Sequence, residues 1–378
     1  MQNKQTIATT LEAKKGFKLN MIIGCDGFVD EIIHLVDKRQ DYANYTRIPT
    51  IAEYGERISR AAGLSANIEM VTIQTKLGGN GPILSNALLE YGVEIVYVGA
   101  LGTPDIHPVF KPMADKAKAV YSLINAASTD ALEFEDGKIM MGKHSVLKEL
   151  TWETMKNGMG GPAGIAKLIN ESNLFGMENW TMIPHMSAIW EGLIDEVFPL
   201  IEDRPVKPLA FFDLADPEKR TREDLLKAMK LVGRFEDKFR TILGLNEKEL
   251  YQVAEVLGVK TIDAPSAEKI KHAVEETHKR LGIYCLMVHT VRMAGCIVAG
   301  GEYIAVDGPY CEKPTLTTGA GDNLNSGFCL AQALGLGPLE SLTLGVATSG
   351  YYVREAKSPT FDEVIQFIRR WDAGQIKE

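Results

Sequence analysis

The feature that most constrains the fold is a strand–helix–strand unit between residues 68 and 99. Residues 68–77 alternate in polarity like a strand, and apolar residues recur at helical spacing from Ile83 to Leu88. A glycine cluster precedes this helix, Gly92 follows it, and residues 93–99 form a second apolar run. Two strands joined by one helix in so short a segment are parallel neighbours in one sheet. The unit therefore predicts an α/β fold.

The charge balance excludes several classes of partner. The 41 Lys and Arg residues face 50 Asp and Glu, giving a net charge of −9 with no basic cluster, so we expect no nucleic-acid partner. No apolar run reaches about 18 residues, so we expect no membrane span. The five cysteines form no C-x-x-C pair, and the N-terminus lacks the apolar stretch of a signal peptide. We therefore expect a cytoplasmic protein.

The rest of the chain indicates further strands and helices. Residues 19–24 are an apolar run that predicts a buried strand, and residues 25–30 are predicted as a loop that carries Asp26 and Asp30. Residues 180–187 are predicted as another strand. A glycine-rich loop at 158–164 lacks the lysine of a P-loop, and we expect a structural turn there. The histidines, His289 among them, lack metal-ligand spacing, so we expect satisfied or surface side chains.

The strongest functional signal is the segment 317–322, which reads Thr-Thr-Gly-Ala-Gly-Asp directly before an apolar helical pattern. A helix start leaves about four backbone N–H groups without partners, and these carry the positive end of the helix dipole. Gly319 and Gly321 have no Cβ to block a bulky anion from this backbone. The segment therefore predicts an anion hole with the carboxylate of Asp322 beside it.

An anion hole beside a base matches phosphoryl transfer to a hydroxyl group. The hole stabilises the charge on the transferring phosphoryl group, and Asp322 accepts the proton of the attacking hydroxyl. The alternative is purely structural: the threonines cap the helix, the glycines make a tight turn, and Asp322 favours the dipole.

The sequence resembles the ribokinase/PfkB family of carbohydrate kinases in three motifs. Residues 317–322 match six of the seven positions of the family's Asp-Thr-Thr-Gly-Ala-Gly-Asp signature. The pair Gly78-Gly79, with the helix and strand after it, matches a second signature, and residues 246–249 match a third, Asn-x-x-Glu. The order agrees from about residue 19 to residue 370. The resemblance implies a three-layer α/β/α fold with a mostly parallel sheet and a small inserted lid.

The resemblance also implies domain limits. Residues 1–30 would start the α/β core, and residues 31–77 with about 127–160 would form the lid insert. Residues 78–126 and 161–378 would complete the core, with the nucleotide and catalytic site. The segment 31–77 looks more helical than the usual β lid of the family. Family lids often pair, which leaves a homodimer open.

The resemblance assigns roles to the matching residues. Asp322 is the catalytic base, and the amides of Gly319, Ala320 and Gly321 form the anion hole. ATP and Mg²⁺ are the implied cofactors, Mg²⁺ being organised through water by Asn246 and Glu249. The same pair also fits a helix capping box. Further nucleotide contacts are implied at Thr290, Arg292, Thr317 and Thr318.

The substrate side is implied by residues near the N-terminus. Asp30 would bind the hydroxyls of a sugar or polyol, with Asp26 as a second candidate. Gly78 and Gly79 would let the substrate lie close to the backbone, and Asn80 would supply an amide. The reaction implied is transfer of the ATP γ-phosphoryl group to a sugar hydroxyl.

Three departures from the family pattern bear on function. Leu316 replaces an Asp that helps to hold a monovalent cation, which argues against potassium activation. Ile83 replaces a sugar-binding Asn, although Asn80 or Asn86 could partly substitute for it. The family's Thr-x-Gly reads Thr-Val-Arg here, ending at Arg292. Two alternatives therefore remain open: a nucleoside kinase of the same family, and a nucleotide- or sugar-binding sensor that has lost turnover.

Overall fold

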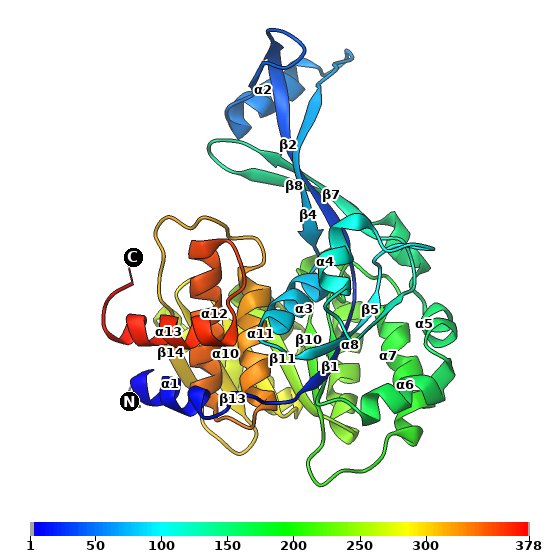
Figure 1. Cartoon of the computed structure of the whole chain (residues 1–378), viewed down its shortest axis with the longest axis vertical. Coiled ribbons are helices and arrows are strands. Elements are labelled where there is room, and N and C mark those ends of the chain that lie inside the picture. Colours follow the sequence, from blue (N-terminus) through cyan, green and yellow to red (C-terminus); the bar gives the residue numbers. More distant parts are fainter. Residues whose placement is uncertain (1–3, 377–378) are drawn as a thin grey trace.

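The computed structural model describes residues 4–376, which build two β-sheets and the helices around them (Figure 1). The larger sheet has nine strands in the order β14-β13-β12-β11-β10-β9-β1-β5-β6. All neighbours from β12 to β6 are parallel, and only β13 and β14 are antiparallel. The strands are β1 (Asn20–Cys25), β5 (Glu94–Gly99), β6 (Ala119–Ser122), β9 (Leu174–Met177), β10 (Leu209–Asp213), β11 (Arg240–Asn246), β12 (Cys285–His289), β13 (Met293–Val298) and β14 (Ile304–Asp307).

Helices cover both faces of this sheet, so the main domain has three layers (Figure 1). One face packs against α5 (Trp152–Gly158), α6 (Gly161–Asn170), α7 (Met186–Gly192), α8 (Arg222–Arg234), α9 (Glu247–Val256) and α10 (Ser266–Leu281). The other face packs against α1 (Lys4–Glu12), α3 (Asn80–Glu90), α4 (Lys111–Ala114), α11 (Ala320–Ala333), α12 (Pro338–Glu355) and α13 (Phe361–Asp372).

The inner strands are mostly apolar along their length, as a sheet that is covered on both faces requires. On β1, Ile22 packs into one apolar cluster while Met21 and Ile23 pack into the other, and all three are fully buried. Full burial of each such side chain contributes about 1.5–3 kcal/mol. This core fixes the carboxyl ends of the parallel strands, the edge at which open α/β sheets bind ligands.

The second sheet projects from one end of the main domain (Figure 1). It contains β2 (Phe28–Arg39), β3 (Tyr45–Arg47), β4 (Met70–Gly78), β7 (Ala127–Glu133) and β8 (Lys138–Lys143). A small apolar cluster formed by residues such as Ile33, Leu35 and Leu132 packs this sheet against α2 (Ile51–Arg60). Strands β2 and β4 are long and join the sheet directly to the main domain.

The structure corrects several sequence predictions. The strands β4 and β5, expected to be parallel neighbours, lie in different sheets, because β4 pairs with β2 whereas β5 pairs with β1 and β6. The predicted loop 25–30 is shorter, because β2 already begins at Phe28 and Asp30 lies on a strand. The segment 31–77 does contain the helix α2, as its helical pattern predicted, although strands make up more of it. The predicted strand 180–187 is wrong: β9 ends at Met177, and residues 180–185 form turns before α7. Residues 144–160 pack on the main domain, so the second sheet ends before the predicted boundary near 160.

Two other expectations concern the whole chain. All five cysteines are free. Between residues 4 and 376, no helix combines the length and the apolar composition needed to cross a membrane.

Candidate active site

The loop before α11 has the geometry of an anion-binding site. Gly319 is the N-cap at a φ of 89°, and no side chain caps the helix. A Cβ at Gly319 would lie 3.0 Å from the Tyr352 hydroxyl and 3.2 Å from Cγ2 of Ile83. The Ala320 N–H already donates to the Thr317 carbonyl at 3.1 Å, whereas within residues 4–376 the N–H groups of Gly319 and Gly321 have no backbone acceptor. Two of the three predicted amides are therefore available to an anion.

This loop separates two cavities. One of about 680 Å³, here called the Asn246 cavity, is walled by α9, α11, α12 and the β12–β13 turn; its lining includes Thr317, Ala320 and Gly321. The other, of about 760 Å³ and here called the Asp30 cavity, lies between the second sheet, α3 and the end of α12; its lining includes Leu316 and Thr318. Neighbouring residues of the loop thus face different cavities, so ligands in the two would meet at the N-terminus of α11.

Asp322 lies in the first turn of α11 and is 8% exposed. The Asn80 side chain donates to its Oδ1 at 2.9 Å. Burial, followed by repulsion from Asp26, raises the pKa of Asp322 to about 7, and the Asn80 hydrogen bond opposes this shift. A general base works best when its pKa is near the working pH, so this environment suits proton abstraction.

Asp26 does not fit the substrate role that the sequence suggested. Its side chain is completely buried, and both oxygens are used by the protein. Oδ2 accepts from the Asn80 N–H at 3.0 Å and from the Asn179 amide at 2.7 Å, while Oδ1 accepts from the Gly81 N–H at 2.9 Å. The Asp26 carboxylate therefore fixes the start of α3 and, through it, the position of the Asn80 side chain.

Asp30 lies on β2 at the wall of the Asp30 cavity. It is 5% exposed, and burial raises its pKa while a hydrogen bond from Thr129 and the charge of Lys76 lower it. A Cβ on Gly78 would lie 2.3–2.6 Å from the Asp30 carboxylate, and one on Gly79 3.1–3.2 Å from that of Asp26. These glycines thus make room for carboxylates of the protein itself, which corrects the expectation that they make room for substrate.

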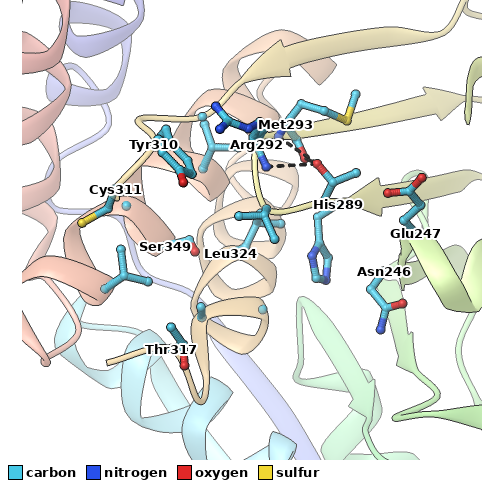
Figure 2. A pocket seen from close by; sticks show the side chains of 18 of the residues that line it. Asn246, Glu247, His289, Arg292, Met293, Tyr310, Cys311, Thr317, Leu324 and Ser349 are labelled. Carbon is cyan, nitrogen blue, oxygen red and sulfur yellow. Dashed lines mark hydrogen bonds between the residues drawn. The ribbon is translucent and has the colours of Figure 1, made fainter. Parts of the chain in front are cut away.

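Asn246 and Glu249 form a capping box at the start of α9. The Asn246 Oδ1 accepts from the Glu249 N–H at 3.0 Å, and Glu249 Oε2 accepts from the Asn246 N–H at 2.9 Å. The second Glu249 oxygen accepts from the Asp216 N–H at 2.8 Å. Each oxygen of this buried carboxylate thus accepts one backbone hydrogen bond. The amide end of Asn246 remains at the wall of its cavity (Figure 2).

Two buried carboxylates next to the site were not assigned from the sequence. Glu178 follows β9 and Asp213 ends β10, so both lie at carboxyl ends of parallel strands, which is the signal that could have found them. Neither oxygen of Glu178 has a hydrogen-bond partner among the residues that the structure describes. Burial and the charges of Asp213, Asp322 and Asp26 hold the pKa of Glu178 well above its usual range. Within residues 4–376, no three His, Cys, Asp or Glu side chains are close enough to hold a metal ion directly.

The turn from β12 to β13 forms another wall of the Asn246 cavity (Figure 2). The Thr290 hydroxyl accepts from the N–H groups of Arg292 and Met293, both at 3.1 Å, so it shapes this turn. The Arg292 guanidinium lies over the Tyr310 ring, 3.9 Å from its centroid. His289 also lines this cavity and was not among the predicted site residues.

Comparison with known proteins identifies the family. The family model of prokaryotic ketohexokinase matches residues 10–371. The chain belongs to the prokaryotic ketohexokinase family. A ketohexokinase of Haloferax volcanii is 29% identical over 349 residues, covering 92% of this chain and 90% of the relative. The prediction of a carbohydrate kinase is thereby confirmed: the chain is a sugar kinase, a phosphotransferase with an alcohol group as acceptor.

Solved structures share the fold at low identity. The ribokinase of Arabidopsis thaliana, complexed with ribose and ATP, is 16% identical with a TM-score of 0.62 over 93% of this chain and 98% of its own. The ribokinase of Thermotoga maritima gives 15% and 0.63 over 93% and 100%. A putative ribokinase II from E. coli, in complex with ATP and Mg²⁺, gives 13% and 0.60 over 94% and 100%. These likenesses confirm the predicted three-layer fold.

Proposed function

We propose that the chain transfers the γ-phosphoryl group of ATP to a hydroxyl group of a ketohexose. One observation carries this proposal: the glycine loop before α11 separates two cavities, and Asp322 lies buried directly beside it. The family and the Haloferax volcanii relative are named for ketohexoses, which supports that class of acceptor.

The Asn246 cavity is the proposed nucleotide site. Its volume of about 680 Å³ lies in the range of ligand pockets. Its wall includes apolar side chains such as Val346 and Val353, which suit a base, and the N-terminus of α11, which suits phosphates. Of the predicted nucleotide residues, Asn246, Thr290, Arg292 and Thr317 line this cavity, whereas Thr318 faces the other one.

Mg²⁺ fits this site as an ion carried by the nucleotide. The charges of Glu249 and Asp322 raise the pKa of Asp213, and that of Glu249 raises the pKa of Asp322, so these three carboxyl groups lie close together at the site. Mg²⁺ keeps several waters and binds few protein groups directly. Asn246 and Glu249 would attract the hydrated ion, which supplies charge neutralisation at the phosphates.

The Asp30 cavity is the proposed acceptor site. Asp30 offers a carboxylate to sugar hydroxyls, and Lys76 lies opposite it in the register of β2 and β4. Ile83 supplies an apolar wall between this cavity and Gly319. Because the second sheet contributes several walls, we propose that it acts as a lid that excludes water during transfer.

The proposed step is an in-line displacement. Asp322 accepts the proton of the acceptor hydroxyl as that oxygen forms a bond to the γ-phosphorus, and the bond from this phosphorus to the bridging oxygen of ADP breaks. The N–H groups of Gly319 and Gly321 would bind the charge that develops on the transferring group. The Leu316 side chain offers no carboxylate to a potassium ion, so we propose that transfer proceeds without one.

Phosphoryl transfer from Mg-ATP to single acceptors tests this function. We expect turnover with one or more ketohexoses, and a far lower kcat/KM with ribose and with adenosine. Preference for adenosine would establish the nucleoside kinase alternative instead. ATP binding without transfer to any sugar would contradict the proposal and favour the sensor.

A further inference from the structure

His289 is the last residue of β12 and stands opposite Asn246 in the parallel register with β11. Its side chain points into the Asn246 cavity beside the Asn246 amide (Figure 2). Among residues 4–376, no charged or hydrogen-bonding neighbour shifts the ring, and burial alone lowers the pKa of His289 to about 4. An imidazole carries at least one N–H in either protonation state, so the ring can donate a hydrogen bond.

The edge of this ring that carries Nε2 faces the anion hole. A Cβ built on Gly321 would lie 3.3 Å from Cε1 and 3.4 Å from Nε2 of His289. The space directly in front of the Gly321 backbone is thus within hydrogen-bond reach of the imidazole. We therefore expect that an anionic oxygen bound by the Gly321 N–H on the side of the Asn246 cavity would also be within hydrogen-bond distance of Nε2.

A packing role explains this arrangement poorly. The ring is partly exposed and lines the cavity, so its polar edge is open to a ligand and is not enclosed in the core.

We propose that His289 is a phosphate-binding residue, whose Nε2–H donates to an oxygen of the β- or γ-phosphate of ATP at the N-terminus of α11. This proposal rests on the proposed function, because it takes the Asn246 cavity as the nucleotide site. It adds a side-chain donor to a hole that is otherwise made of backbone amides.

Calorimetric titration of ATP, ADP and adenosine into the full-length protein tests this role. The variants are His289→Leu, His289→Asn and His289→Gln, because Gln places its amide nitrogen near the position of Nε2 and Asn near that of Nδ1. A lost hydrogen bond to a charged group weakens binding by about 10- to 100-fold. We expect this loss of ATP affinity in the Leu and Asn variants, partial recovery in the Gln variant, and unchanged adenosine affinity in all three.

The comparison of nucleotides assigns the contact. Loss for both ATP and ADP places it at the β-phosphate, and loss for ATP alone places it at the γ-phosphate; either result supports the proposal. Equal weakening of adenosine, or unchanged ATP affinity in the Leu variant, would overturn it. If the wild type binds ATP and phosphorylates a sugar while the Leu variant binds ATP equally well, only this proposal fails. If the wild type does not bind ATP, the proposed function fails first.

Discussion

The hydrogen bond from Asn80 to Asp322 gives a sharp prediction about pH dependence. The base works in its deprotonated form, so kcat/KM should rise with pH through the pKa of Asp322, which is about 7. The Asn80 donor, 2.9 Å from Oδ1, favours the charged carboxylate and so lowers this pKa. Removing it in Asn80→Ala should move the acidic limb to higher pH.

The size of the shift follows from the strength of the bond. A hydrogen bond to a charged group contributes about 1.5–3 kcal/mol, and one pH unit corresponds to about 1.4 kcal/mol. Water can enter the space left by the Asn80 side chain and donate a hydrogen bond to Asp322 in its place. The loss is then only partial, and we expect the pKa of Asp322 to rise by roughly one unit.

The assay is the pH profile of kcat/KM for the preferred sugar at saturating Mg-ATP. Asn86→Ala is the matched control, because Asn86 lies on the same helix and lines the Asp30 cavity without contacting Asp322. Its profile should keep the wild-type limb. If the acidic limb of the kcat/KM profile stays in place or moves to lower pH in Asn80→Ala, the reasoning is refuted. This holds whether or not the maximum value of kcat/KM changes.

Three further predictions test the loop and its surroundings. Gly319→Ala forces a side chain into a φ of 89° and against the Tyr352 hydroxyl, so kcat should fall by roughly 10²-fold in a steady-state assay. Tyr352→Phe removes the 2.8 Å hydrogen bond to the Thr318 carbonyl and should lower the free energy of unfolding by about 1 kcal/mol in urea. Replacing potassium by choline at constant ionic strength should leave kcat unchanged, because the Leu316 side chain offers no carboxylate to the ion; a large loss would contradict this.

Local signals made the centre of the site predictable. The glycine pair, the helix and the strand at residues 78–99 carry their own periodicity, and the loop at 317–322 combines glycines with a helix start. The capping box at Asn246 also depends only on neighbours in sequence. In each case the residues that decide the structure lie within a few positions of one another.

The errors arose where distant contacts decide the structure. Apolar residues at 180–187 alternate like a strand, but the sheet pairs 174–177, and Trp180 and Ile183 instead fill the core from turns. The local composition of 25–30 suggests a loop, yet β4 and β7 pair with Asp30 from both sides.

The roles of single side chains depend on contacts between distant parts of the chain. Asn80 and Asp322 are 242 positions apart. The sequence suggests Asp26 as a substrate ligand, but in the structure its carboxylate accepts hydrogen bonds from Asn80, Gly81 and Asn179. His289 and Glu178 belong to no sequence motif. Their position is apparent only in the structure, where His289 lines the Asn246 cavity and Glu178 lies among other buried carboxyl groups.

The measurement that tests the central claim most directly is the kcat of Asp322→Asn with the preferred sugar, together with its affinity for ATP. Burial raises the pKa of Asp322, so the charged form is disfavoured in the folded protein, and the neutral amide should not lower thermal stability. The account predicts that kcat falls by at least about 10²-fold while ATP affinity is kept. A variant that turns over at close to the wild-type rate would contradict Asp322 as the base.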